Sequence, residues 1–123
     1  MLNESVLVDT GPLIAFYNDD DAHHAACKEQ MSVLAVGKAY TCWPVIVEAA
    51  YMLRGRLEQR DDLLESVGNG SLPLFRLRAG DIGPVRAILT KYHDQGIDLA
   101  DACLLHLADR SCTWLTARIS AQF

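Results

Sequence analysis

The sequence predicts an α/β fold, a three-layer sandwich with a mainly parallel central sheet. Short β-prone runs alternate with segments whose apolar residues recur at helical spacing, which is the pattern of βα crossovers that cover a parallel sheet. The first of these runs is apolar throughout, as expected of a strand buried on both faces. The chain has 123 residues and no linker, internal repeat or low-complexity tract, so we expect a single domain over residues 1–123.

Turn signals set the limits of the elements in the first half of the chain. The first apolar run ends in Asp-Thr-Gly-Pro, a turn and helix-start signal, and Gly37 ends the second helical pattern. Pro44 stands where proline is tolerated in the first turn of a helix, and that helix ends at Gly55. These signals predict strands at 5–9 and 39–42 and helices at 12–17, 22–36 and from 44 onward.

The second half of the chain continues the alternation. A helical pattern ends at Gly-Asn-Gly, and the alternating run after it contains Pro73, which favours an edge strand or a strand start. Gly83-Pro84 interrupts the next helical pattern near its beginning. We expect helices at 58–67, 81–93 and 98–109, and strands at 72–77 and 112–116.

Charge and hydropathy exclude some classes of protein. The net charge of −5 argues against a protein that holds nucleic acid by bulk electrostatics. It does not exclude a nuclease, because acids gathered at a metal site account for much of the excess. No run approaches the roughly 20 apolar residues of a membrane span, and the first residues lack the basic start of a signal peptide. We therefore expect a cytoplasmic protein with no membrane association.

Four cysteines lie far apart in the sequence, in no paired spacing. Free cysteine behaves as a small hydrophobic residue and is usually buried. We interpret them as reduced core residues: Cys27, Cys42, Cys103 and Cys112.

Acids in apolar surroundings are the most informative residues of this chain. Asp9 ends the first buried strand, where sites form in open α/β sheets. Glu48 and Asp101 have no Lys or Arg within four residues, although buried acids need a partner. Asp98 lies three residues before Asp101, on the same helical face. A shared metal ion would explain all four. Asp98 and Asp101 also fit a simpler role as the N-cap and N3 acids of their helix.

The ligand chemistry of these acids favours Mg²⁺, with Mn²⁺ as a substitute, because hard oxygen ligands without His or Cys suit these ions. Such an ion activates water for phosphodiester hydrolysis. The sequence also allows a phosphohydrolase in which Asp9 is a covalent nucleophile. Against that reading, no second Asp stands two residues further on to act as the acid and base.

Four segments together resemble PIN-domain proteins, and their order and spacing are similar to those of VapC-like toxins. They are Val-Asp-Thr-Gly-Pro-Leu-Ile-Ala at 8–15, Asp-Asp-Ala-His-His-Ala at 20–25, Pro-Val-Ile-Val-Glu-Ala-Ala-Tyr at 44–51 and Asp-Leu-Ala-Asp-Ala-Cys-Leu at 98–104. The resemblance implies a Mg²⁺-dependent endoribonuclease of PIN fold that acts on RNA, is neutralised by a VapB-like antitoxin and forms a homodimer. It implies that Asp9, Glu48 and Asp101 bind the metal, with Asp98 as an accessory acid and Thr10 beside the site.

The C-terminal segment departs from this family. PIN-domain proteins usually have Thr-x-Asp after the last strand, whereas this chain has Thr116-Ala117-Arg118. Thr116 is thus expected near the site, and Arg118 replaces a fourth acid. The resemblance therefore leaves a second possibility, a catalytically impaired PIN module that binds antitoxin or RNA without cutting it.

Several other residues have alternative interpretations. Arg54, Arg56 and Arg60 are candidates for contacts with RNA phosphates, but a solvated, salt-bridged surface is favoured for them. We expect two tryptophans, Trp43 and Trp114, to be core aromatics rather than base-stacking platforms. An oligomer interface or an antitoxin groove could be formed by the apolar faces of the early helices, with Phe16, Tyr17, Met31 and Leu34.

Overall fold

The computed structural model describes residues 5–34 and 38–110 and the backbone of 117–119. The described strands are β1 (Val6–Val8), β2 (Ala39–Tyr40) and β3 (Ala117–Ile119). The α-helices are α1 (Thr10–Tyr17), α2 (His24–Ser32), α3 (Trp43–Met52), α4 (Leu57–Gly68), α5 (Ile82–Lys91) and α6 (Leu99–Arg110). Two short 3₁₀ helices, η1 (Ala79–Asp81) and η2 (His93–Gln95), flank α5.

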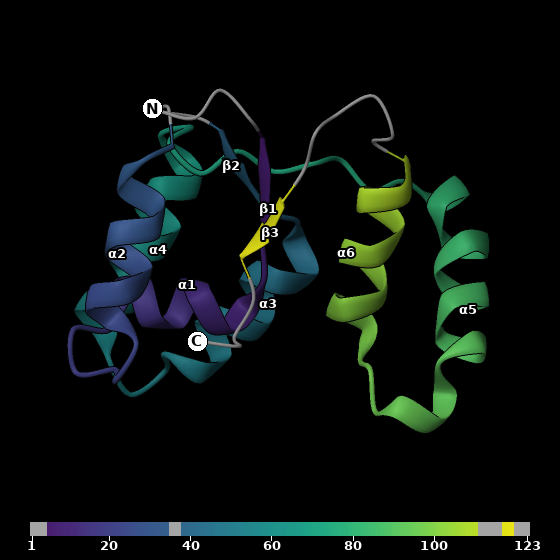
Figure 1. Ribbon diagram of the computed structural model, residues 1–123, viewed down its shortest axis with the longest axis horizontal. Coiled ribbons are helices and arrows are strands. Elements are labelled where there is room, and N and C mark those ends of the chain that lie inside the picture. The colour runs from purple at the N-terminus through teal and green to yellow at the C-terminus, as the bar shows by residue number, and fades with distance from the viewer. Residues whose placement is uncertain (1–4, 35–37, 111–116, 120–123) are drawn as a thin grey trace.

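The described strands form a parallel sheet in the order β2-β1-β3. Val6 of β1 pairs with Ala39 on one side and with Ala117 on the other, so β1 is the central strand. Helices α1, α2 and α4 lie on one side of the sheet, and α5 and α6 lie on the other (Figure 1). The structure thus confirms the predicted α/β sandwich with a parallel central sheet.

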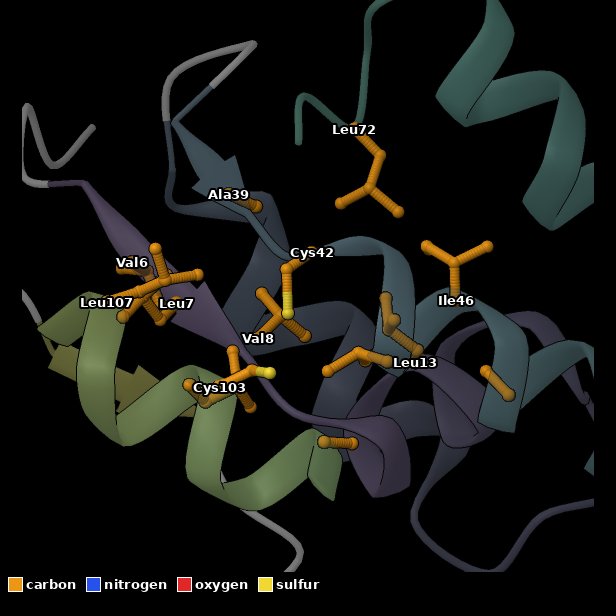
Figure 2. Close-up of a cluster of buried hydrophobic side chains, with 14 of the residues drawn as sticks. Val6, Leu7, Val8, Leu13, Ala39, Cys42, Ile46, Leu72, Cys103 and Leu107 are labelled. Atoms are coloured by element: carbon orange, nitrogen blue, oxygen red, sulfur yellow. The ribbon is translucent and has the colours of Figure 1, made fainter. Parts of the chain in front are cut away.

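The core lies between the sheet and the helices on both sides of it. All three residues of β1 are buried, which agrees with the continuous apolar run in the sequence. Figure 2 shows Leu107 of α6 near Val6 and Leu7, and Cys42 near Val8. The largest fully buried aliphatic side chains of the described residues include Leu7, Leu13, Ile46, Leu53, Leu63, Leu104 and Leu107.

Three of the four cysteines fall within the described residues, and all three are free and buried, as predicted. Burial raises the pKa of the Cys27 thiol to about 11 and that of the Cys42 thiol to about 12. Both thiols therefore stay protonated near neutral pH. Cys112 lies outside the described residues.

Among the described residues, Thr41 is a deeply buried polar residue whose side chain forms a hydrogen bond. It is fully buried, and its Oγ1 donates a hydrogen bond of 2.9 Å to the carbonyl oxygen of Val8. Its backbone also bridges to Leu74 and accepts a hydrogen bond from the backbone N–H of Phe75. Because Val8 directly precedes Asp9, Thr41 fixes the chain at the point where the first candidate acid leaves the sheet.

Replacement of Thr41 by Val, which has nearly the same shape, is expected to lower the free energy of unfolding by about 1–3 kcal/mol. The loss comes from the buried bond to the Val8 carbonyl, since the valine methyl cannot donate a hydrogen bond. Urea denaturation measures the change, and Thr90→Val at an exposed site is the matched control. Equal losses in both variants would show that the Thr41 bond contributes nothing.

A charged network joins η1 to the last turn of α6. The Oδ1 atom of Asp81 accepts hydrogen bonds from Nε2 of His106 at 2.7 Å and Nη1 of Arg110 at 2.9 Å. Its Oδ2 atom accepts from the backbone N–H of Arg78. The His106 bond, the Arg78 backbone bond and the Arg110 charge lower the pKa of Asp81 to about 2. Asp81 therefore stays ionised across the physiological range, with its charge matched by Arg110.

Some predicted boundaries differ from the structure. The strand predicted at 72–77 is wrong as a strand, because the chain there makes only an isolated bridge, through Leu74. The carbonyl oxygen of Pro73 does accept a hydrogen bond from the backbone N–H of Thr41. Helix α2 is shorter at both ends than the predicted 22–36, and α1 begins at Thr10, two residues before the prediction. The strand predicted at 112–116 lies outside the described residues.

Among residues 5–34 and 38–110, none of the helices has the length and apolar content that a membrane span requires.

Candidate active site

Asp9 is placed by the junction of β1 and α1. It follows the buried strand directly and is the N-cap of α1, with extended backbone angles (φ −83°, ψ 171°). Its Oδ1 atom accepts a hydrogen bond of 2.8 Å from the backbone N–H of Thr10. The half-buried carboxylate thus stands at the carboxyl end of the central strand, where sites form in parallel sheets.

Glu48 comes from α3, which packs against both α1 and α6. Pro44 in the first turn suits the start of this helix, and the buried face of the helix includes Val45, Ile46 and Ala49. Glu48 lies beside that face and is half-buried. The position of α3 between its two neighbours brings this acid to the same edge of the sheet as Asp9.

Asp98 and Asp101 form a reciprocal capping arrangement at the start of α6. The backbone N–H of Asp101 donates to Oδ1 of Asp98 at 2.9 Å, and the backbone N–H of Asp98 donates to Oδ2 of Asp101 at 3.1 Å. The capping role considered from the sequence is therefore present. It engages one oxygen of each carboxylate in a backbone bond and leaves the second oxygen for other contacts. Asp98 is exposed and Asp101 is half-buried.

Electrostatics shows that the four acids are neighbours. A hydrogen bond with Asp98, followed by burial, raises the pKa of Glu48, and the same bond lowers the pKa of Asp98. Glu48 is therefore the member of this pair that holds a shared proton more readily. Burial, together with the negative charges of Asp98 and Asp9, raises the pKa of Asp101. The structure thus gathers all four sequence-predicted acids into one region of negative potential, which a cation would relieve.

Thr10 contributes a buried hydroxyl to this region. Among the buried side-chain polar atoms of the described residues, Thr10 Oγ1 is the one without a hydrogen bond of good geometry. It nevertheless lies close enough to the Glu48 carboxylate to lower that group's pKa. Thr10, which was expected beside the site, lies next to Glu48. An unsatisfied buried hydroxyl is costly in a purely structural position, so a further polar ligand suits this place.

The donor set fits a hard divalent cation. It consists of carboxylate oxygens and a hydroxyl, the ligands that Mg²⁺ and Mn²⁺ prefer. Within residues 5–34 and 38–110, however, no three acidic, His or Cys side chains are grouped closely enough to hold one ion together. Mg²⁺ commonly takes only one or two protein carboxylates and keeps several waters. The residues therefore fit an ion held by a pair of acids.

An apolar groove of about 620 Å³ adjoins the acids. Its lining includes Glu48 and Asp98, together with the exposed side chains of Trp43, Val47, Tyr51 and Leu99. The prediction that Trp43 lies in the core is wrong, because 59% of the residue is exposed. Trp43 is the first residue of α3, and its place after a strand did not reveal its exposure. Trp114 lies outside the described residues.

A family comparison agrees with this geometry. The model of the PIN domain matches residues 6–116, which include β1, every described helix and all four acids. The chain belongs to the PIN-domain family. This PIN domain is 31% identical to the protein named Ribonuclease VapC26 of Mycobacterium tuberculosis over 107 residues, which cover 85% of this chain and 78% of that protein.

A solved structure supports the fold of this PIN domain. The crystal structure of VapC20 of Mycobacterium tuberculosis, described as a toxin that cleaves the sarcin-ricin loop, matches it with a TM-score of 0.80. The match covers 96% of this chain and 92% of that one. At 16% sequence identity, this likeness concerns the fold.

The remaining candidate residues have varied surroundings. Arg56 forms an ion pair of 2.9 Å, which agrees with a salt-bridged surface, but its partner is Asp20 and not one of the nearby acids expected from the sequence, Glu58, Asp61 and Asp62. Arg54 lies over the ring of Tyr51, 4.0 Å from its centroid. Leu34 is buried in the core, so the prediction that it forms part of an open interface is wrong. Thr116 lies outside the described residues.

Proposed function

We propose that this PIN domain is a metal-dependent endoribonuclease of the VapC type. In this proposal Asp9, Glu48 and Asp101 form the site for Mg²⁺, or for Mn²⁺ in its place; a pair of them would hold the ion directly, and Asp98 assists. The main support is the convergence of four acids, two of them with raised pKa, at the carboxyl end of β1. The relative named a ribonuclease, 31% identical over most of both chains, supports RNA as the substrate.

The proposed mechanism assigns separate roles to the acids. A bound divalent ion supplies activation of the attacking water and stabilises charge on the leaving oxygen. Glu48 has the raised pKa and a hydrogen bond to Asp98, so this pair is suited to take up the proton that the water releases. The capping bonds of α6 hold Asp101 in place, and the Thr10 hydroxyl lies beside the Glu48 carboxylate.

The test of this function is RNA cleavage by the purified chain. A mixed pool of RNA is incubated with the protein in Mg²⁺, in Mn²⁺ and with excess EDTA. The proposal expects endonucleolytic fragments with either ion and none with EDTA. Cleavage that persists in EDTA, or the absence of cleavage with both ions, would contradict it.

The same family relationship supports a proposal about the partners of this PIN domain. We propose that a VapB-like antitoxin neutralises it and that the active form is a homodimer in the cytoplasm. Co-purification with the product of an adjacent reading frame would support the first proposal. Sedimentation of the isolated chain measures the second.

A second candidate function is an impaired PIN module that binds without cutting. Arg118 is the observation that favours it, since it stands where the family usually has an acid. The backbone pairs Arg118 of β3 with Leu7 of β1, two residues before Asp9 along the neighbouring strand. A positive residue beside the strand that leads to the site would oppose binding of a cation there.

Replacement of Arg118 by Asp is expected to raise the affinity for Mn²⁺ by about 10-fold and to increase RNA cleavage. The reason is the exchange of a positive charge for a metal-ligating oxygen next to β1. Isothermal titration with Mn²⁺ measures the affinity, and a cleavage assay measures the rate. Arg118→Asn is the matched control, because it removes the charge without adding a carboxylate. Equal gains in both variants would assign the effect to charge alone.

A further inference from the structure

Two surface hollows with cationic lining lie at helix α5 and at the segment that precedes it. One hollow of about 360 Å³ is lined by Arg76, Arg78, Gly80, Asp81 and Arg110. The other, of about 470 Å³, is lined by Gly83, Arg86, Ala87, Thr90 and Lys91. Only one of these residues is acidic, although the whole chain has a net charge of −5. The segment 76–81 and the exposed face of α5 therefore carry a local excess of positive charge on an acidic protein.

Four of these cations have no carboxylate partner in the part of the chain that the structure describes. Arg110 is engaged by Asp81 and by the carbonyl oxygen of Arg76. The charge of Asp81 is thereby matched. The remaining four form what we call the basic track: Arg76, Arg78, Arg86 and Lys91.

The basic track leads toward the candidate active site. Helix α5 packs beside α6 at the outer edge of the molecule (Figure 1). The two helices are antiparallel, so the last turn of α5, with Lys91, is at the same end as the first turn of α6, with Asp98 and Asp101. The 10 residues of α5 span about 15 Å. The track thus runs from residues 76–78, before η1, to Lys91, which lies at the same end of the helix pair as the first turn of α6.

We propose that the basic track binds the phosphodiester backbone of the RNA substrate on one side of the cut. This inference rests on the proposed ribonuclease function, and it adds where the RNA runs. A strand whose scissile phosphate lies at the acids would place neighbouring phosphates along α5, where Lys and Arg can neutralise them. Such contacts fix the position of the strand without reading its sequence, and they offset the repulsion from an acidic protein.

The lining of the two hollows favours RNA over an acidic protein partner. Protein interfaces usually have a core of aromatic or large apolar side chains. The hollows contain none, and their smaller residues are Gly80, Gly83, Ala87 and Thr90. Separate cations spaced along a helix suit the regular charges of a nucleic-acid backbone. The exposed acids at the ends of this surface are Asp94 and Asp109, outside both hollows.

Gly83 offers a sharp test, because it lines the second hollow and lies in the first turn of α5. A Cβ atom added there would meet nothing within 4 Å, so a longer side chain has open space. Gly83→Glu introduces a negative charge into the basic track. Gly83→Gln is the control, because glutamine has nearly the same shape as glutamate and no charge. Both variants place the same Cβ before Pro84, which restricts the backbone of the residue preceding it, so Gly83→Glu is compared with Gly83→Gln rather than with the wild type, and their melting temperatures are expected to agree.

The readout is the binding of single-stranded RNA of random sequence. Fluorescence anisotropy measures this binding in EDTA over a range of KCl concentrations. Gly83→Glu is expected to weaken binding several-fold relative to Gly83→Gln. The double variant Arg78→Gln/Arg86→Gln is expected to reduce the slope of log affinity against log salt by about 0.7 for each lost phosphate contact. Lys28→Gln/Lys38→Gln, which changes the net charge equally away from α5, should leave the slope unchanged.

The outcomes separate this proposal from the proposed enzyme activity. Salt slopes that fall only in the α5 variants support the basic track, even if no cleavage is detected. Cleavage by the wild type together with unchanged slopes in the α5 variants overturns the track and leaves the nuclease. Equal binding by Gly83→Glu and Gly83→Gln also overturns it. Binding of polyglutamate in place of RNA would assign this surface to an acidic protein and overturn the proposal as well.

Discussion

Replacement of Glu48 by Gln is expected to reduce RNA cleavage by about 100-fold or more while the fold keeps or gains stability. Cleavage falls because the amide neither binds the cation as a carboxylate does nor accepts a proton with Asp98. Stability is retained because the neighbouring acids disfavour the ionised form of Glu48, as its raised pKa shows. An acid that lowers stability and is required for activity has a functional role.

The pH dependence of folding follows from the same shift. The pKa values of Glu48 and Asp101 are higher in the folded chain than in the unfolded chain. Each group therefore favours folding at pH values below its unfolded pKa, and this contribution is lost as the pH rises through the raised pKa. Without divalent ions, Glu48→Gln should show a smaller loss of stability than the wild type between mildly acidic and neutral pH.

Cleavage rates and urea denaturation at several pH values measure both effects of the Glu48 substitution. Glu58→Gln is the matched control, because it makes the same chemical change at an exposed position in the first turn of α4. The control should leave cleavage and its pH dependence unchanged. Full activity in Glu48→Gln would show that the metal site has been assigned to the wrong acids.

Addition of Mn²⁺ to the metal-free chain is expected to raise its free energy of unfolding by about 2.7 kcal/mol when the ion is at 100 times its dissociation constant. The ion binds the folded chain, where the acids are gathered, and offsets the burial and the charge repulsion that together raise the pKa of Asp101. The unfolded chain keeps these acids far apart in sequence and offers no equivalent site. Thermal unfolding at increasing Mn²⁺ concentration measures this effect.

Asp101→Asn separates binding at the site from general effects of the ion. The amide keeps an oxygen that can accept the N–H of Asp98, so the capping bond at the start of α6 can persist. The variant should fold and lose most of the stabilisation by Mn²⁺. Asp109→Asn, at an exposed position near the end of α6, is its control and should respond like the wild type. Stabilisation of Asp101→Asn equal to that of the wild type would contradict the assigned site.

The central strand and the four acids could be predicted from the sequence because their signals are local. A continuous apolar run has to be buried, and an acid at its end falls at the carboxyl edge of a parallel sheet. Acids in apolar helical segments mark the sides of α3 and α6 that face this edge. The spacing of Asp98 and Asp101 also predicted their capping bonds, since N-cap and N3 positions are three residues apart.

Features that depend on distant contacts could not be predicted in the same way. The alternating pattern at 72–77 resembles a strand, but the structure gives it a single bridge to Thr41. Pattern alone does not show whether a neighbouring strand is available along the whole segment. Trp43 has a large apolar surface that usually favours burial, yet the packing of α3 against its neighbours leaves it in an open groove. The basic track likewise joins cations that no short motif connects.

The wide separation of the four acids along the chain has a consequence for synthesis. Asp9 leaves the ribosome early, whereas Asp98 and Asp101 follow near the end and reach their places only when the first turn of α6 closes its paired hydrogen bonds. A nascent or truncated polypeptide that lacks α6 has only part of the ligand set. The proposed nuclease activity therefore cannot appear before α6 has been synthesised and folded.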